Sequence, residues 1–481
     1  MKIETMYELS PLQKGMLFHC LRAGGTDVYI TQVMWQIRGE LNREALQQAW
    51  QRALERHAIL RTAFFWENLD APLQVVFGQV ALPFEQHDWR GLPPQEQQAR
   101  MEAARERDRA SVAAIGKAPL MRLTLARTAE DTHMLLWSRH HLLLDGWSQV
   151  VVLREVFTLY ELYCWGESGE TEDQLLGPVQ PFARYIAWLQ QQDLQAAAPF
   201  FGRMLAGLEA PTPLRGAGDT PGGQPGELVR HLPAERTAAL QELARTNGLT
   251  LNTLVQGAWA ALLAHDAGAA DVVFGLTGAG RPTELPGIEA MVGLFINTLP
   301  IRVGLPPDAA LLPWLHELQR LHTELRQYEH APLYEVQGWS RVPRQLPLFE
   351  SVVVFENYPM DMGQLDQGSS LELKPVQSHI QNSLPLTLRA VPGTELGLHI
   401  LHDGRRIDTA AAARVLDLVD AALAALVEQQ HGRVADLLGA ITAAERRRQQ
   451  HSAQQSKQAG AQLLRGIARR PARGVAVGEP A

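Results

Sequence analysis

The alternation of apolar and polar residues predicts a chain in which strands and helices follow one another. Residues 133–137 are mostly apolar, which is typical of a buried strand. From Trp147 to Cys164 apolar residues return at every third or fourth position, which predicts a helix with one buried face. Asp145 and Gly146 stand between these two segments and break the strand. Such a turn fixes the backbone and opens to one side, so it is a suitable place for a reactive side chain.

The same alternation predicts further elements on both sides of this turn. Strands are predicted at 32–39, at 119–127 and from residue 271, and helices at 42–57, 93–109, 233–246, 250–265 and 408–429, with a long helix from residue 182. Because the helix at 93–109 is polar, we interpret it as a solvated face, on which Glu106 and Asp108 are solvated charges. Alternating strands and helices over 481 residues predict an α/β protein with two domains or two lobes.

Composition and charge narrow the class of protein. With 46% hydrophobic and 20% charged residues the chain has the composition of a soluble globular protein, and its net charge of −8 argues against a general nucleic-acid binder. Its two cysteines, Cys20 and Cys164, imply no disulfide framework and suit a reducing cytoplasm. The start of the chain is polar and no apolar run is as long as a membrane span, so we expect a cytoplasmic protein without a membrane segment.

His140 and His141 are the strongest candidates for chemistry, and two interpretations of them are open. In one, a strand ends in two half-buried histidines that have no further role. In the other, one imidazole acts on a substrate, since its pKa lies near neutrality. A metal site is not favoured, because adjacent strand residues face opposite sides and neither a cysteine nor a third histidine stands nearby at ligand spacing. Asp145 can bond locally or pair with a cation, and either would brace the loop.

The run His-His-x-x-x-Asp-Gly at residues 140–146 resembles the core motif of the condensation domains of nonribosomal peptide synthetases, a superfamily that includes chloramphenicol acetyltransferase. Ser10 and Lys14 are mild departures from the family pattern, Glu350 replaces the commoner Asp, and Ala279 stands where the family usually has a Ser. The resemblance extends from Tyr7 to Arg448, and further family motifs are matched, in the same order, by residues 7–19, 56–66, 182–189, 291–300, 334–340 and 348–359.

The resemblance implies an α/β (α+β) fold of two chloramphenicol acetyltransferase-like lobes, arranged as a V-shaped pseudo-dimer with the active site in a tunnel between them. Residues 1–172 would form the N-terminal lobe with the histidine motif, and residues 173–448 the C-terminal lobe with floor and latch segments. Residues 449–481 are rich in Gln, Ala and Arg and lack the apolar residues of a core, so we interpret them as a flexible tail or a linker to another domain.

The resemblance also implies roles within the histidine motif. His141 would be the catalytic residue, either by accepting a proton from the acceptor amine or by holding that amine in line, and the sequence leaves both roles open. His140, Asp145, Gly146 and Trp147 would support His141.

Outside this motif, the resemblance points to four more residues. Arg61 begins an apolar strand, where an unpaired charge is costly, so it is either a surface residue at the strand end or the partner of a buried carboxylate. The resemblance implies the second, as an Arg61–Asp145 ion pair. Gly293, Asn297 and Arg281 would lie in the floor or the tunnel wall, and Asn297 can equally be a buried, hydrogen-bonded amide without a further role.

The implied activity is that of an amide-bond-forming acyltransferase. A donor peptidyl or aminoacyl thioester and an acceptor aminoacyl thioester would arrive on the 4'-phosphopantetheine arms of two carrier proteins, and the acceptor's α-amine would attack the donor carbonyl. No bound cofactor, nucleotide or metal is expected. The partners would be the donor and acceptor peptidyl carrier proteins and neighbouring synthetase domains, with neither nucleic acid nor membrane, and the isolated domain would be a monomer.

The subtype and two alternatives concern the details of this activity. The stretches Leu9–His19, Trp66–Val76 and Gly146–Ser148 resemble the subtype that follows epimerisation domains and joins a D-configured donor to an L-configured acceptor. An epimerisation domain itself typically continues the motif with Val-Ser-Trp, where this chain has Trp147-Ser148. A catalytically silent docking module that recruits a tailoring enzyme usually loses a histidine or the glycine of the motif, and this chain keeps both.

Overall fold

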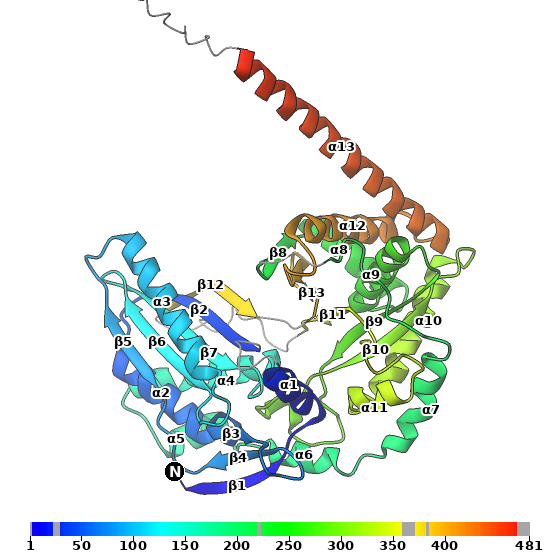
Figure 1. Cartoon of the computed structure of the whole chain (residues 1–481). Helices are drawn as coiled ribbons and strands as arrows, with labels where there is room; N and C mark the ends of the chain where they lie inside the picture. The colour runs from blue at the N-terminus through cyan, green and yellow to red at the C-terminus, as the bar shows by residue number, and fades with distance from the viewer. Residues whose placement is uncertain (1, 23–28, 219–222, 358–370, 381–383, 469–481) are drawn as a thin grey trace, which may run out of the picture.

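Two lobes form a V in the computed structural model, which describes residues 2–22, 29–218, 223–357, 371–380 and 384–468 (Figure 1). The N-terminal part contains β1 (Ile3–Glu8), α1 (Pro11–Arg22), β2 (Ile30–Arg38), α2 (Arg43–Arg56), β3 (Thr62–Phe65), β4 (Leu73–Phe77), β5 (Phe84–Asp88), α3 (Pro94–Val112), β6 (Met121–Arg127), β7 (Thr132–His140), α4 (Gly146–Cys164) and α5 (Glu170–Leu176).

The remaining elements follow from residue 183 onward. They are α6 (Ala183–Leu189), α7 (Leu194–Met204), β8 (Gly226–His231), α8 (Ala234–Thr246), α9 (Leu251–Ala267), β9 (Asp271–Gly278), β10 (Asn297–Gly304), α10 (Leu311–Arg326), α11 (Leu333–Gly338), β11 (Ser351–Phe355), β12 (Glu372–Ile380), β13 (Leu386–Val391), β14 (Gly397–His402), α12 (Thr409–Glu428) and α13 (Val434–Ala468). Two short 3₁₀ turns occupy Ala58–Arg61 and Ile288–Ala290.

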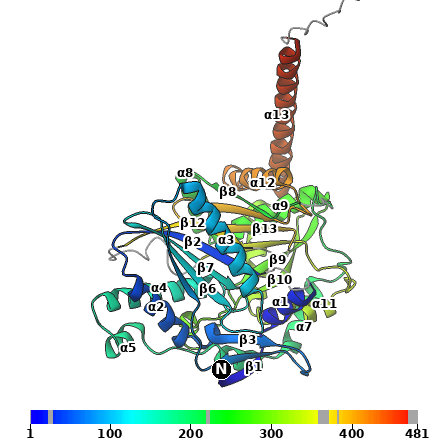
Figure 2. The ribbon, with the colours of Figure 1, turned by 60° about the vertical axis from the view of Figure 1, so that its left-hand side comes forward.

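A five-stranded sheet in the order β12-β2-β7-β6-β5 forms the centre of the first lobe. β7 pairs with β2 in antiparallel register, with His140 opposite Ile30. Helices α2 and α4 share one hydrophobic core with this sheet, in which the rings of Trp50 and Trp137 lie 4.8 Å apart. Helix α3 lies across the sheet on its other side (Figure 2). The end of β7, where the histidine motif begins, is therefore fixed by packing on both faces.

A six-stranded sheet in the order β10-β9-β11-β13-β14-β8 forms the centre of the second lobe. Apolar side chains of alternate strand positions, such as Leu398 and Ile400 of β14, join a core with helices α8, α9, α10 and α12. Helix α13 continues from this lobe and projects away from it (Figures 1 and 2).

Three segments that follow residue 173 belong physically to the first lobe. β12 is the edge strand of the first lobe's sheet and pairs antiparallel with β2, with Leu373 opposite Ile37. The stretch from Leu285 to Phe295 contributes five buried side chains besides Leu285 to the first lobe's core, as do Phe182, Tyr185 and Ile186. A division of the chain at 172/173 therefore does not separate the two cores, because apolar segments pack where the three-dimensional contacts favour them.

The predicted helix ends agree with the structure where a local cap sets them. Asn42 caps α2 by accepting a hydrogen bond from the Ala45 N–H at 3.1 Å, and Asp408 caps α12 through the Ala411 N–H at 2.7 Å. The long helix expected from residue 182 is instead two helices, α6 and α7. Asp193 caps the second of these by accepting from the Gln195 N–H at 2.9 Å, so a new helix begins there. Helix α13 runs through residue 449, where a flexible tail was expected to begin.

The interpretation of Asp108 as a solvated charge is wrong. Its side chain is completely buried beneath α3, where Ser138 Oγ donates to its carboxylate at 3.2 Å and Arg122 Nε at 3.1 Å. Burial raises the pKa of this carboxyl group, against the opposing effect of Arg122. The polar composition of this helix gave no sign of the contact, because only the packing of α3 on the sheet shows which of its positions face inward. None of the helices in the described part of the chain has the length and apolarity needed to cross a bilayer.

Candidate functional site

His140 is the last residue of β7, and its imidazole is a buried, neutral group. The Leu142 N–H donates to its Nδ1 at 3.1 Å, so this nitrogen is an acceptor and Nε2 carries the hydrogen. Nε2 lies 3.7 Å from the Sγ of Cys20 in α1. Burial lowers the pKa of His140 to about 3, which keeps the ring uncharged at neutral pH. Both ring nitrogens have partners within the protein, so His140 holds the turn together and offers nothing to a substrate.

His141 follows the strand and is only partly buried. Its N–H donates to the Tyr29 carbonyl at 2.8 Å, and its Nδ1 lies 2.9 Å from the Leu144 carbonyl. A carbonyl only accepts, so the hydrogen sits on Nδ1 and the lone pair is on Nε2. Burial, and secondly the positive charge of Arg139, lower the pKa of this imidazole. His141 is therefore neutral at pH 7 and has a nitrogen that can accept a proton.

Asp145 joins the histidine turn to the segment 291–300, which contains the expected floor residues Gly293 and Asn297. One carboxylate oxygen accepts from the Ser148 N–H at 2.8 Å and so caps α4, whose first residue is Gly146. The other accepts from the Phe295 N–H at 3.0 Å. Asp145 is almost fully buried, and these bonds occupy both of its oxygens, so its role is to fix two backbone segments rather than to take part in proton transfer.

The expected Arg61–Asp145 ion pair is wrong. Arg61 Nη1 donates to Glu4 Oε2 at 2.7 Å and to the backbone carbonyls of Phe77 and Gly78, all in or next to the small sheet β1-β4-β3. The arginine near Asp145 is Arg281, whose Nη2 lies 3.5 Å from Oδ1. Both arginines are buried, and only the packing of distant segments decides which of them meets the carboxylate.

Arg281 lies at the centre of this junction. Its guanidinium donates to Ser148 Oγ at 2.8 Å, to the Met291 carbonyl at 3.0 Å and to the Ile288 carbonyl. It also lies over the Phe295 ring at 4.0 Å and near the Trp147 ring at 5.1 Å, both within the range of cation–π attraction. The indole N–H of Trp147 donates to the Glu289 carbonyl at 2.9 Å, so the tryptophan of the motif also binds this segment.

The two expected floor residues fix backbone rather than present polar groups. The Gly293 carbonyl accepts from the Asp145 N–H at 3.1 Å and from Ser148 Oγ at 2.8 Å, and a Cβ on Gly293 would lie 2.1 Å from the Phe182 ring. Only glycine therefore fits there. Asn297 is buried and its amide donates at 2.8 Å to the carbonyls of Glu329 and Ala331, which is the structural role left open by the sequence.

Sequence reasoning missed two polar residues of this region. Ser148 Oγ bonds to both backbone groups of Gly293 and to Arg281, and its position directly after the motif was the available signal. Glu329 accepts from the Gly280 N–H at 3.1 Å, and burial raises the pKa of its carboxyl group. Glu329 lies beside the stretch in which exposed Ala279 replaces the usual serine. About fifty residues of chain separate Glu329 from this stretch, so no local sequence pattern could connect them.

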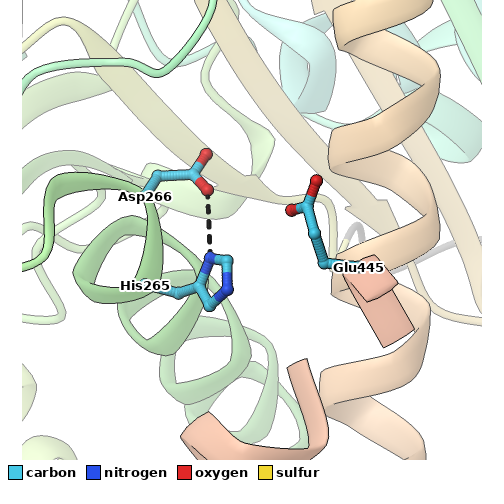
Figure 3. Close-up of side chains that lie close together, drawn as sticks. All are labelled: His265, Asp266 and Glu445. Carbon is cyan, nitrogen blue, oxygen red and sulfur yellow. Dashed lines mark hydrogen bonds and ion pairs between the residues drawn. The ribbon is translucent and has the colours of Figure 1, made fainter. Parts of the chain in front are cut away.

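One group of side chains among the described residues has the arrangement of a metal site, but it already binds a cation of the protein. His265, Asp266 and Glu445 lie close together between α9 and α13 (Figure 3). The guanidinium of Arg414 in α12 donates to Asp266 at 2.6 and 2.9 Å and to Glu445 Oε1 at 2.9 Å. Both carboxylates thus bind the same arginine, which makes the group an ion-pair anchor for α13.

Comparisons with known proteins agree with this geometry. A family model described as Condensation domain matches residues 3–448. One of the linear gramicidin synthase proteins of Brevibacillus parabrevis is 45% identical over 451 residues, which are 92% of this chain and 8% of that protein. Another protein of the same synthase is 44% identical over 454 residues, 93% of this chain and 6% of that protein. The chain thus spans less than a tenth of the length of these curated relatives.

Solved structures show the same fold. A four-domain nonribosomal peptide synthetase bound to AMP and glycine superimposes with a TM-score of 0.76 at 18% identity, over 90% of this chain and 34% of that chain. The complex of the X-domain and OxyB from teicoplanin biosynthesis gives a TM-score of 0.73 at 21% identity, over 91% of this chain and 96% of that chain. The two-lobe mixed fold and the family predicted from the motifs are confirmed. Since the family model covers almost the whole chain up to residue 448, this protein belongs to the condensation-domain family of nonribosomal peptide synthetases.

Proposed function

We propose that the chain transfers a donor acyl group from a carrier-protein thioester to the α-amine of an acceptor aminoacyl thioester, with His141 as the catalytic residue. The observation that carries this proposal is the state of the His141 ring. Its Nδ1–H is bound by the Leu144 carbonyl, the ring is neutral, and Nε2 keeps its lone pair. An uncharged imidazole with a fixed tautomer is the group that amine attack on a thioester requires.

The proposed reaction balances without a further reagent. The amine nitrogen attacks the thioester carbonyl carbon, the new C–N bond forms, and the C–S bond breaks to release the donor arm as a thiol. Nε2 of His141 takes the proton from the attacking nitrogen and returns it to the departing sulfur. In the second role left open by the sequence, Nε2 only accepts a hydrogen bond from the amine and holds it in line. Tethering both reactants supplies much of the rate through proximity.

Two carrier proteins would be the immediate partners in this proposal, each with its substrate on a 4'-phosphopantetheine arm that enters a tunnel between the lobes. Neighbouring synthetase domains would hold these carriers, which fits the small share of its relatives that this chain covers. The protein itself would need no bound cofactor. The cytoplasmic location and the monomeric state stay predictions.

We further propose that the donor residue is D-configured and the acceptor L-configured. This rests on the stretches Leu9–His19, Trp66–Val76 and Gly146–Ser148, which resemble the subtype that follows epimerisation domains. A donor pocket of this kind selects by a clash with the wrong Cα substituent as well as by contacts with the right one.

Condensation and the preference for a D-configured donor can be tested in one experiment. The acceptor carrier is incubated with matched D- and L-terminated donor carriers in competition, and its intact mass is then measured. Faster transfer of the D-terminated donor supports the subtype, and faster transfer of the L-terminated donor rejects it while leaving condensation intact. Loss of donor chirality without any transfer would indicate epimerisation. Neither transfer nor epimerisation, with a tailoring enzyme retained by the chain, would indicate a docking module.

A further inference from the structure

Tyr29 has an unusual backbone conformation at a point that touches the proposed catalytic residue. Its φ is +67°, and among the described residues only Tyr29 and Asn68 combine a side chain with a positive φ. Asparagine adopts this left-handed conformation readily, whereas a bulky residue such as tyrosine rarely does. Strained residues of this kind persist where the surroundings hold them, and they are common at functional sites.

The carbonyl of Tyr29 is what this conformation presents to His141. The pairing of β2 with β7 ends at Ile30 and His140, and the His141 N–H then donates to Tyr29 at 2.8 Å. His141 is thus held at two points, by its backbone N–H and by the bond of its Nδ1 to the Leu144 carbonyl. If Tyr29 relaxed to a negative φ, its carbonyl would turn away and the first of these two points would be lost.

The side chain of Tyr29 is bonded to α1. Its hydroxyl lies 2.7 Å from Nδ1 of His19, and the two rings are stacked with an angle of 11° between them. The next residue of the same helix, Cys20, contacts His140, and Gln13 donates to the Leu142 carbonyl at 2.9 Å. Helix α1 therefore supports the histidine turn through three side chains, and His19 reaches it only by way of Tyr29.

We propose that Tyr29 is a positioning residue for His141, and that its hydroxyl bond to His19 keeps the left-handed backbone that presents the Tyr29 carbonyl. This inference rests on the proposed function, in which His141 carries the reaction. The pair needs no contact with substrate. It sets the direction in which the imidazole leaves the strand, and so the place of Nε2 relative to the attacking amine.

Four variants separate the backbone from the hydroxyl. Tyr29→Phe keeps the ring and removes the hydroxyl, and His19→Ala removes its partner. Tyr29→Gly adopts a positive φ without strain, whereas Tyr29→Ala does not. Tyr7→Phe is the matched control, because the buried Tyr7 hydroxyl has no hydrogen-bond partner among the described residues. Melting temperatures establish that each variant is folded before its kinetics are compared.

We expect Tyr29→Ala to lower kcat about a hundredfold, with KM for both loaded carriers unchanged. Tyr29→Phe and His19→Ala should each lower kcat about fivefold, the loss expected for one hydrogen bond, and the double variant should be no worse than either. Tyr29→Gly should retain more activity than Tyr29→Ala. The acid limb of the pH–rate profile should move to higher pH in Tyr29→Ala, because a loosened imidazole is more hydrated, a change that a loss of overall stability would not produce.

The inference is overturned if Tyr29→Phe and Tyr29→Gly both turn over like the wild type, or if Tyr29→Ala and Tyr29→Gly are equally impaired. It is likewise overturned if all losses lie in melting temperature alone. His141→Ala distinguishes this failure from that of the proposed function. If the His141→Ala variant is active, the proposed function is rejected. If His141→Ala is inactive while all Tyr29 variants are fully active, only the positioning role of Tyr29 is rejected.

Discussion

Two buried arginines join segments that are far apart in the sequence, and they do so with different chemistry. Arg281 binds mostly uncharged oxygens, namely Ser148 Oγ and the carbonyls of Ile288 and Met291, with Asp145 more distant at 3.5 Å. Arg414 is held by two carboxylates, Asp266 and Glu445, at distances between 2.5 and 2.9 Å. The first junction surrounds the histidine turn, and the second attaches α13 to α9 and α12.

The difference shows what each junction controls. Around Arg281, the Asp145 carboxylate and the Ser148 hydroxyl bond to backbone groups of Gly293 and Phe295, so this network sets backbone positions next to His141. Around Arg414, charge is matched to charge, and the backbone near His141 is not involved. We therefore expect changes at the first junction to affect both stability and turnover, and changes at the second to affect stability alone.

The largest effect is expected for Asp145→Ala. This change removes the cap of α4, the bond to the Phe295 N–H and the only carboxylate within 4 Å of Arg281 among the described residues. A buried ion pair that loses one partner typically costs about 3–5 kcal/mol of unfolding free energy. Denaturant unfolding measures the loss, and turnover should fall with it.

Asp145→Asn is the intermediate control for this change, because its single amide oxygen keeps an acceptor for the Ser148 N–H, whereas the charge and the acceptor for the Phe295 N–H are lost. It should be less destabilised than Asp145→Ala. Full stability of Asp145→Ala together with selectively lost turnover would contradict the structural role and indicate direct catalysis by the carboxylate.

His141→Ala should reduce kcat by about a hundredfold or more, which corresponds to about 2.7 kcal/mol of barrier, while the fold persists. Half-buried His141 forms no ion pair with any described residue, so its removal should cost little stability. Single-turnover transfer between loaded carriers measures the rate. His431→Ala, at an exposed position of the second lobe, serves as the control and should behave as the wild type. Rapid transfer by His141→Ala would reject a chemical role for the imidazole.

Arg414→Met should lower the free energy of unfolding by about 1–3 kcal/mol, because Asp266 loses its guanidinium partner and Glu445 keeps only Arg215, whose Nη1 lies 3.8 Å from Oε2. The kcat of the folded fraction should not change. Adding Glu445→Gln to this variant removes one of the two negative charges that Arg414 had bound and should restore part of the stability. A fall in kcat without a loss of stability would mean that the two junctions are not independent.

Arg139→Gln should have the smallest effect, a shift in the pH–rate profile. Burial and the Arg139 charge both lower the pKa of His141 from its ordinary value of 6.5. In the wild type the imidazole is therefore still unprotonated, with its lone pair free, at a pH where an ordinary histidine is already protonated. Without the positive charge the pKa rises, and the acid limb of kcat/KM should move to higher pH. An unchanged acid limb would mean that His141 is not the group whose protonation stops the reaction.

The sequence by itself determined the features that depend on neighbouring residues. The period of apolar positions predicted the helix Gly146–Cys164 to within one residue, and the caps Asn42 and Asp408 were recognisable because a capping side chain bonds only three residues ahead. The same local order placed His140 and His141 between a strand and a helix, and ordered motifs identified the family.

Tertiary structure alone decided which distant groups meet. The arginine partner of Asp145 is Arg281 rather than Arg61, and Asp108 of α3 is buried against the sheet. Strand β12 completes the sheet of the first lobe, and Tyr29 is held in a left-handed conformation beside His141. In each case the outcome depends on which segments hydrophobic packing brings together. A charge can then pair only with a group that lies within a few ångströms of it. The separation of two residues along the chain does not predict their distance in space.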